Sequence, residues 1–222
     1  MYIDIKNLSK NIKGTPILSN ITVRFDSGKI YGLKGKNGSG KTMLMRTISG
    51  LIRPTKGQVV INGEVLGDDI SFPKSIGVLI ENPSFINKYT GYKNLQLLAN
   101  IQNKIGSEKI IETLKKVGLD PFDKRVYRKY SLGMKQRLGI ACAIMEEPDI
   151  VVLDEPINAL DNNGVLIIRN ILLDIKNRGG IVIVACHDNE ELELLSDEIY
   201  ELCDGKIINH IVLNKGDKSN EE

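Results

Sequence analysis

The sequence predicts an α/β fold with a mixed, mostly parallel sheet, an antiparallel β subdomain at the N-terminus and an inserted helical subdomain. First, residues 30–33, 150–153 and 181–186 are apolar without alternation, which is typical of parallel strands buried on both faces. Second, the glycine-rich segment GKNGSGKT at 35–42 follows the first of these runs and precedes a stretch with helical spacing. Third, helix signals fill residues 83 to 147, and strands and helices alternate again after them.

The first thirty residues read as short strands and hairpins. Alternation in YIDIKNL, ILSNITVRF and DSGKIYGL is interrupted by the polar turn segment NIKGTP. The helix TMLMRTIS is expected to end at Gly50, a suitable C-cap. Residues 58–61 and 64–66 then flank the pair Asn62-Gly63. Asn-Gly between two such runs is a strong signal for a type I′ hairpin.

The middle of the chain, from about residue 83 to 147, is predicted to be the helical subdomain. Thr90 can cap a helix through 91–103, a second helix over 107–117 ends at Gly118, and a third runs from near Ser131 to Pro148. The later elements are expected as strands at 150–153 and 181–187, helices at 162–178 and 189–197, and a hairpin around Asp204-Gly205. We expect one domain over residues 1–213 and a frayed polar tail over 214–222.

The composition indicates a globular protein without a strong charge bias. The 222 residues are 41% hydrophobic and carry a formal charge of +2, which gives no strong case for nucleic-acid binding. The basic run KRVYRK at 124–129 fits a solvated helical face. Cys142, Cys186 and Cys203 lie far apart in apolar runs, so we expect buried thiols in a reducing compartment. No apolar stretch is long enough to cross a bilayer, and Met1 directly precedes a strand-like segment, so we expect a cytoplasmic protein.

Residues 35–42 fit the phosphate-binding pattern G-x-x-x-x-G-K-[ST]. The backbone N–H groups of the loop would turn toward a triphosphate, aided by the helix N-terminus; the loop comprises Gly35, Lys36, Asn37, Gly38, Ser39 and Gly40. Lys41 would place its charge on the β and γ phosphates, and the Thr42 hydroxyl would ligate Mg²⁺. The segment therefore predicts a P-loop NTPase that binds a nucleoside triphosphate, against the alternative of a glycine-rich surface turn.

Two carboxylates follow the apolar strand at 150–153. Asp154 and Glu155 stand at its C-terminal end, where open α/β sheets place their ligands. We expect Asp154 to hold the Mg²⁺ shell, directly or through water, and Glu155 to polarise the attacking water. An acidic turn after a strand is the structural alternative, but a P-loop in the same chain favours the catalytic interpretation.

Two further elements complete an ordered set. Ser131 and Gly133, in YSLGMKQRL, lie at a predicted helix start, where a hydroxyl and free N–H groups face outward together. His187 follows the apolar strand at 181–186. The order of P-loop, Glu81, the segment 131–136, the acidic pair, the segment 159–161 and His187 closely resembles that of the ATP-binding-cassette (ABC) ATPases, over residues 3–213.

The resemblance implies a role for each segment. Residues 35–42 correspond to the Walker A loop, 150–154 to the Walker B strand, 131–135 to the signature and 159–161 to the D-loop. Glu155 then matches the family's catalytic glutamate and His187 its switch histidine. In this family two cassettes close head to tail, with each ATP between the Walker A loop of one and the signature of the other. ATP binding thus closes the dimer, and hydrolysis opens it.

Four positions depart from the commonest family pattern. Glu81 replaces a glutamine, and its carboxylate could still bind Mg²⁺. Together with the segment IENPSF, this glutamate resembles the subgroup that exports, or protects against, peptide antibiotics of the bacitracin and lantibiotic type. Leu132 replaces a signature glycine. Met43 replaces a hydroxyl residue that contacts the α-phosphate, and one lost hydrogen bond costs on the order of 1 kcal/mol. Ile12 stands where an aromatic ring usually stacks on adenine, so we expect loose base selectivity.

The resemblance implies the ATPase subunit of an ABC transporter. Since no spanning helix is predicted, a separate multi-spanning permease is expected. It would bind near residues 81–92 and neighbouring helix residues, and the cassette would lie at the inner face of the cell membrane. The working dimer is either two copies or a pair with a related ATPase. Two other functions stay open: a soluble cassette acting on ribosomes or DNA, and a nucleotide-binding regulator with little turnover. The guanine-binding pattern NKGD at 214–217 lacks a companion switch motif and is attributed to chance.

Overall fold

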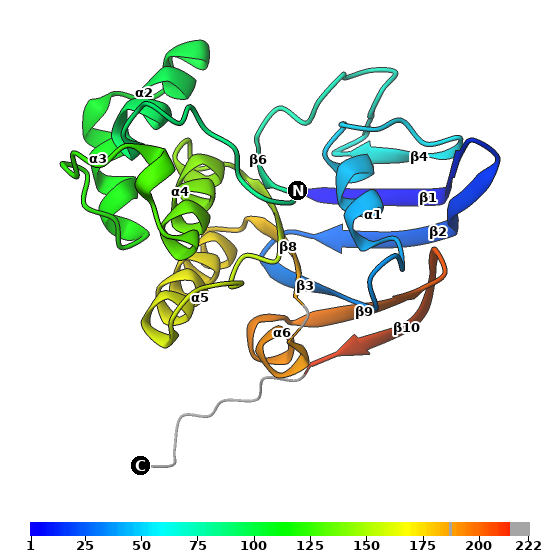
Figure 1. Cartoon of the computed structure of the whole chain (residues 1–222). Coiled ribbons are helices and arrows are strands. Elements are labelled where there is room, and N and C mark those ends of the chain that lie inside the picture. The colour runs from blue at the N-terminus through cyan, green and yellow to red at the C-terminus, as the bar shows by residue number, and fades with distance from the viewer. Residues whose placement is uncertain (187, 214–222) are drawn as a thin grey trace.

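The computed structural model describes residues 1–186 and 188–213, and these residues form two sheets with helices around them (Figure 1). The smaller sheet is antiparallel, in the order β2-β1-β4-β5, with β1 (Tyr2–Ile12), β2 (Thr15–Asp26), β4 (Lys56–Ile61) and β5 (Glu64–Val65). The larger sheet has the order β10-β9-β3-β8-β7-β6, with β3 (Lys29–Lys34), β6 (Ile76–Leu79), β7 (Ile150–Asp154), β8 (Ile181–Ala185), β9 (Glu198–Cys203) and β10 (Lys206–Val212). Only β10 runs antiparallel to its neighbour in the larger sheet, so the predicted fold class is confirmed.

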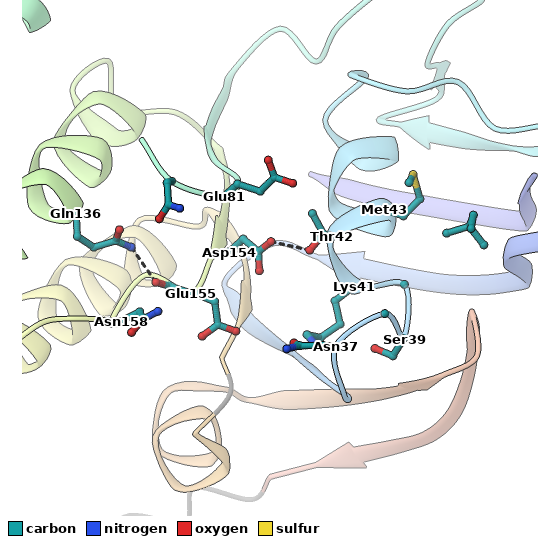
Figure 2. A pocket seen from close by; sticks show the side chains of 14 residues that line it. Asn37, Ser39, Lys41, Thr42, Met43, Glu81, Gln136, Asp154, Glu155 and Asn158 are labelled. Carbon is teal, nitrogen blue, oxygen red and sulfur yellow. Dashed lines mark hydrogen bonds between the residues drawn. The ribbon is translucent and has the colours of Figure 1, made fainter. Parts of the chain in front are cut away.

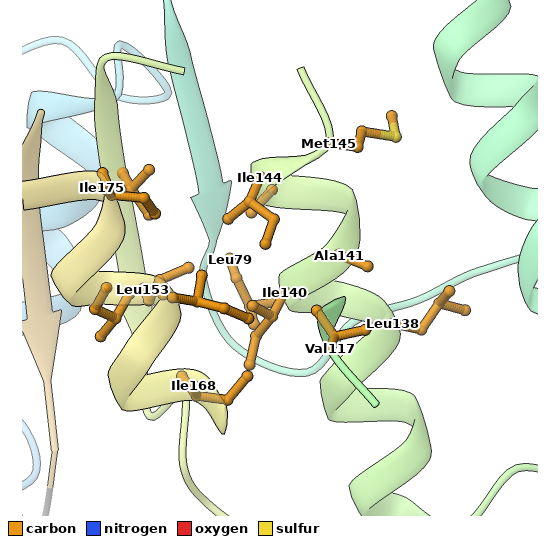
Figure 3. Close-up of a cluster of buried hydrophobic side chains, with 14 of the residues drawn as sticks. Leu79, Val117, Leu138, Ile140, Ala141, Ile144, Met145, Leu153, Ile168 and Ile175 are labelled. Carbon is orange, nitrogen blue, oxygen red and sulfur yellow. The ribbon is translucent and has the colours of Figure 1, made fainter. Parts of the chain in front are cut away.

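The strands β7 and β8 of the larger sheet are buried along their whole length, as their unbroken apolar sequences predict. Along β7, Val151 and Leu153 belong to a hydrophobic cluster shared with helices of the middle and later chain, which Figure 3 shows around Ile140 and Ile168. The alternate residues of β7 belong to the cluster on the other face, which includes side chains of α1 and of the small sheet. Both faces of the large sheet are therefore covered.

The helices begin and end close to their predicted positions. They are α1 (Lys41–Ile48), α2 (Gly91–Gln102), α3 (Ser107–Lys116), α4 (Leu132–Ile144), α5 (Asn162–Asn177) and α6 (Asn189–Leu195), with a 3₁₀ turn η1 (Tyr127–Lys129). The Thr90 side chain accepts a hydrogen bond from the Lys93 N–H and so caps α2. The end of α4 differs from the prediction, because the chain leaves the helix before Pro148 and Glu147 adopts φ 52°. Figure 1 shows α2, α3 and α4 together on one side of the molecule.

Both predicted tight turns are present. Asn62 and Gly63 have φ values of 51° and 91°, and Asp204 and Gly205 have values of 47° and 74°. Left-handed backbone at both central positions is what a type I′ hairpin requires. The strands β4 and β5 pair across the first turn, and β9 and β10 pair across the second.

One of the three cysteine predictions is wrong. Cys186 is buried and Cys142 is half-buried, whereas Cys203 is exposed because it is the last residue of β9, beside the turn to β10. Burial raises the pKa of the Cys142 thiol to about 11, so this thiol is protonated at neutral pH. Among the described residues, no helix has both the length and the apolar character needed to span a bilayer.

Glu198 at the start of β9 makes this edge of the sheet sensitive to acid. Its side chain is 10% exposed and pairs with Lys29 at 2.7 Å and with the His210 ring at 2.8 Å. Burial alone would raise the pKa of Glu198, but its hydrogen bonds with Lys29 and His210 outweigh burial and hold it below the usual 4.5.

We therefore predict that Glu198 stabilises the fold above pH 4.5 and that this contribution disappears as the pH falls through its lower folded pKa. Urea unfolding followed from pH 7 to well below pH 4.5 should give a smaller loss of unfolding free energy on the acid side for Glu198→Gln than for the unsubstituted chain. Equal slopes in the two proteins would contradict this assignment. Glu193→Gln, on the exposed face of α6, serves as the matched control.

Candidate active site

The P-loop and the acidic pair line one cavity of about 520 Å³ at the carboxyl ends of the parallel strands (Figure 2). The loop leaves β3 and enters α1, and the acidic pair follows β7. The residues that line this cavity are Ile17, Asn37, Gly38, Ser39, Gly40, Lys41, Thr42, Met43, Glu81, Asn82, Gln136, Asp154, Glu155 and Asn158. Gly35 and Lys36 line a second cavity of about 560 Å³ behind the loop, and Asn37, Gly38 and Ser39 border both.

The backbone of the loop leaves no room for side chains at its first and last glycines. A Cβ atom on Gly35 would collide with the Leu202 carbonyl oxygen, and one on Gly40 would lie 2.8 Å from Leu18 Cδ2. Both glycines also have positive φ, 153° and 108° respectively, a region that favours glycine. The pattern of two fixed glycines in the sequence thus has a direct steric cause.

Two polar groups of the loop are buried. Lys41 is 6% exposed, and its ammonium donates to the Gly35 and Lys36 carbonyl oxygens at 2.6 and 3.3 Å. The Ser39 hydroxyl is buried, and within the described part of the chain it has no hydrogen-bond partner. An unsatisfied buried hydroxyl costs about 1–3 kcal/mol. A phosphate oxygen would remove this cost, so the loop fits a nucleotide.

An oxygen pair lies at the junction of α1 and β7. The Thr42 hydroxyl donates to Asp154 Oδ2 at 2.7 Å, and Asp154 is only 8% exposed. Hydroxyl and carboxylate oxygens are the ligands that Mg²⁺ prefers. Glu81, the third predicted metal ligand, lines the same cavity, but its carboxylate accepts a hydrogen bond from Arg46 at 2.6 Å and points away from Asp154 (Figure 2). The structure therefore brings Thr42 and Asp154 together and leaves Glu81 apart.

The backbone of Glu155 is held from two sides. Its N–H donates to the Ala185 carbonyl at 2.8 Å, and its own carbonyl accepts from the Gln136 side chain at 2.8 Å. Its φ of 53° turns the chain so that the side chain enters the cavity on the side of the P-loop (Figure 2). Gln136, on α4, was not predicted as a site residue, although it lies within the segment YSLGMKQRL. Its amide ties the helical part of the chain to the backbone that carries this carboxylate.

The charges of the acidic pair influence the pKa of the buried Cys186 thiol. Burial, followed by the charge of Glu155, raises the pKa of Cys186 far above its usual range. The thiol is therefore neutral and unreactive at physiological pH.

Besides Gly35 and Lys36, three predicted nucleotide-binding residues outside the loop do not line the cavity. Ser131 is exposed, and its hydroxyl caps α4 by accepting a hydrogen bond from the Met134 N–H at 3.2 Å. Gly133 lies against the backbone of residue 159, because a Cβ atom on it would be 2.8 Å from the Ala159 carbonyl oxygen. Ile12 lies exposed at the end of β1, whereas Ile17 of β2 lines the cavity with Met43. His187, and the pattern at 214–217, lie outside the described residues.

A family model described as ABC transporter matches residues 18–158. The chain belongs to the ABC transporter family of ATPases. It is 47% identical over 205 residues to the ABC transporter ATP-binding protein YybJ of Bacillus subtilis strain 168, covering 92% of this chain and 94% of the relative. It is 37% identical over 222 residues to a bacitracin transport ATP-binding protein of Enterococcus faecalis, covering 99% and 72%.

A lantibiotic transport ATP-binding protein of Streptococcus pyogenes is 36% identical over 205 residues, covering 92% of this chain and 88% of the relative. Among solved structures, an ATP-binding subunit of an ABC transporter has a TM-score of 0.87 at 26% identity, covering 96% and 91%. A dimeric bacterial ABC transporter cassette has the same fold, with a TM-score of 0.87 at 24% identity over 96% and 100%. As an ABC ATPase, the chain binds and hydrolyses ATP as the subunit of a transporter.

The place of Ile17 in the cavity predicts where the base of ATP lies. Replacing Ile17 with tyrosine would add a ring on which the base can stack, worth about 1–3 kcal/mol per base. We expect Ile17→Tyr to bind ATP about 5- to 150-fold more tightly in calorimetric titrations, with no change for inorganic tripolyphosphate. Ile12→Tyr is the matched control and should leave both affinities unchanged. The reverse pattern would place the base beside Ile12.

Proposed function

We propose that this ATPase energises a separate multi-spanning permease that exports a peptide antibiotic, such as a lantibiotic, or gives immunity to it. Two relatives that match nearly the whole chain are named for bacitracin and for lantibiotic transport. These names are the main support for a peptide antibiotic as the transported substrate. Glu81 and the segment IENPSF, which suggested the same subgroup from sequence, support it independently of the names.

We assign the triphosphate to the P-loop and Mg²⁺ to the oxygens of Thr42 and Asp154. The cation would neutralise charge on the β and γ phosphates. Lys41 holds its ammonium against the loop carbonyls and would bring its positive charge to the phosphates. The buried Ser39 hydroxyl gains a partner in the same step. This assignment uses hydroxyl and carboxylate oxygens only, consistent with a hard cation.

Glu155 is the proposed general base. Its carboxylate lies in the cavity, while the hydrogen bonds from its N–H and to its carbonyl fix the backbone. A carboxylate held in this way can accept a proton from a water that attacks the γ-phosphate. His187 keeps the role of a catalytic partner that its place in the sequence predicted. The two backbone hydrogen bonds of Glu155 matter because a misplaced base contributes much less to the rate of hydrolysis.

The second half of the ATP site is proposed to come from another cassette. Ser131 and Gly133 lie outside the cavity, at an exposed helix N-terminus, and the adjacent Leu132 is 64% exposed. Such an end can offer N–H groups to a phosphate held by another chain. A cassette with this fold has been solved as a dimer, which supports the arrangement. The partner is a second copy or a related ATPase.

A groove of about 510 Å³ is the proposed docking site of the permease. It lies between β6 with the preceding residues and the helices α2 and α4. Its apolar side chains are open to solvent, with Ile101 78% and Phe72 58% exposed. An amphipathic helix of the permease would bury them. None of the residues 81–92, where the contact was predicted, lines this groove. A permease bound in it would keep the cassette at the inner face of the membrane.

For Glu155→Gln we predict a loss of ATP hydrolysis of about 10²–10⁴-fold with ATP binding retained, because a general base contributes that much. Phosphate release and nucleotide titration on the purified chain measure the two quantities. Glu193→Gln, exposed on α6, should leave both unchanged. Unchanged hydrolysis by Glu155→Gln would remove Glu155 from this role.

The same variant tests the cargo in cells. A strain without this gene should become more sensitive to at least one lantibiotic or to bacitracin. The unsubstituted gene should restore resistance, and the Glu155→Gln gene should not. Unchanged sensitivity to every such peptide would contradict the proposed cargo while leaving the ATPase assignment intact.

For Ile101→Glu we predict that ATP binding by the isolated chain is unchanged, whereas the share of the chain recovered with the membrane fraction falls severalfold. A buried charge in an apolar interface carries a desolvation cost that the free chain does not bear. Leu166→Glu, on a similarly exposed apolar position of α5, is the control and should stay with the membrane. Equal membrane recovery for both variants would place the docking site elsewhere.

A further inference from the structure

The helix that follows the P-loop carries a cation one turn beyond the proposed metal ligand. Thr42 and Arg46 are four residues apart on α1, so their side chains project from the same side of the helix. Thr42 bonds to Asp154, whereas the Arg46 guanidinium donates to Glu81 Oε1 at 2.6 Å. One helix face therefore contacts two acidic groups of the same cavity, each through a different side chain.

Glu81 is held in an unusual position. It lies two residues after the end of β6 and has a φ of 63°, a value that residues other than glycine adopt rarely. It lines the cavity, yet Figure 2 shows its carboxylate turned away from Asp154. The ion pair with Arg46 accounts for this direction. The Glu81 and Arg46 side chains are 63% and 32% exposed, and ion pairs so exposed are weak.

We propose that Arg46 is a positioning residue that holds Glu81 away from the metal site and thereby sets the affinity of that site for its divalent cation. A cation at Thr42 and Asp154 recruits the Glu81 carboxylate only by breaking its bond with Arg46. The binding equilibrium therefore includes the loss of that bond, and removing Arg46 tightens cation binding. This inference rests on the proposed metal site at Thr42 and Asp154.

The exchange of Glu81 between Arg46 and the cation takes place directly after the strand β6. β6 lines the groove with Ile76, Gly77 and Val78, and Glu81 follows this strand at the edge of the nucleotide cavity. Arg46 ties that point to the P-loop helix when Glu81 is not bound to the cation. Transfer of Glu81 from Arg46 to the cation shell changes which element the end of β6 is bound to.

The test is a double-mutant cycle on cation affinity. Mn²⁺, which also takes oxygen ligands, is titrated into the full chain saturated with a non-hydrolysable ATP analogue, and free Mn²⁺ is read by electron paramagnetic resonance. We expect Arg46→Met to tighten Mn²⁺ binding about two- to fivefold, which is the range of an exposed ion pair. Glu81→Gln should weaken binding, and Arg46→Lys should behave like the unsubstituted chain.

The deciding result is the double variant. If Arg46 acts by holding Glu81, Arg46→Met has no effect in a chain that already carries Glu81→Gln. If Arg46 acts only through its positive charge near the cation, the same tightening persists without Glu81, and the proposal is overturned. It is also overturned if Arg46→Met leaves Mn²⁺ affinity unchanged in the presence of Glu81.

Two controls separate this inference from the site on which it rests. Arg24→Met breaks an exposed pair with Asp26 on β2 and should leave Mn²⁺ affinity unchanged. Asp154→Asn should weaken binding strongly in every background. If Asp154→Asn has no effect, or if the unsubstituted chain binds no Mn²⁺ with the analogue, the proposed metal site itself fails. Failure of the cycle alone removes only the role of Arg46.

Discussion

The register of β8 between its two neighbours is the constraint on which the site depends. Ala185 pairs with Leu33 of β3 on one side and with Asp154 of β7 on the other. Because the strands are parallel, the P-loop and the acidic pair leave the sheet at the same edge. The bond from the Glu155 N–H to the Ala185 carbonyl extends this ladder beyond Asp154. A slip of one residue would move the buried side chains to the other face and separate Thr42 from Asp154.

Two connections join this rigid edge to the rest of the molecule. Gln136 of α4 donates to the Glu155 carbonyl, so the helical part of the chain contacts the backbone of the proposed base. Arg46 of α1 holds Glu81, which follows the strand that lines the groove. Both connections are single hydrogen bonds or exposed pairs, and therefore weak compared with the buried sheet. The nucleotide cavity and the groove are thus joined by contacts that can change without disturbing the core.

The parts of the fold that follow from local sequence were predictable. The P-loop, the buried strands and both Asn-Gly or Asp-Gly hairpins depend on residues that are neighbours in the chain, and each is present. Tertiary contacts were not predictable in the same way. Ile17 and not Ile12 lines the cavity, and the sequence does not reveal which side chain of the β1–β2 hairpin reaches it. The pair of Arg46 with Glu81 joins elements 35 positions apart, and Cys203 is exposed because it ends its strand beside a turn.

The most direct test of the account is to purify the tagged chain from detergent-solubilised membranes of its own cells and identify what accompanies it. A cassette that powers a permease should bring one multi-spanning membrane protein in a fixed ratio to itself. Ribosomal proteins, DNA-bound proteins or no companion would contradict the transporter role. Each of these results would favour a cassette that works in solution, with the same nucleotide site.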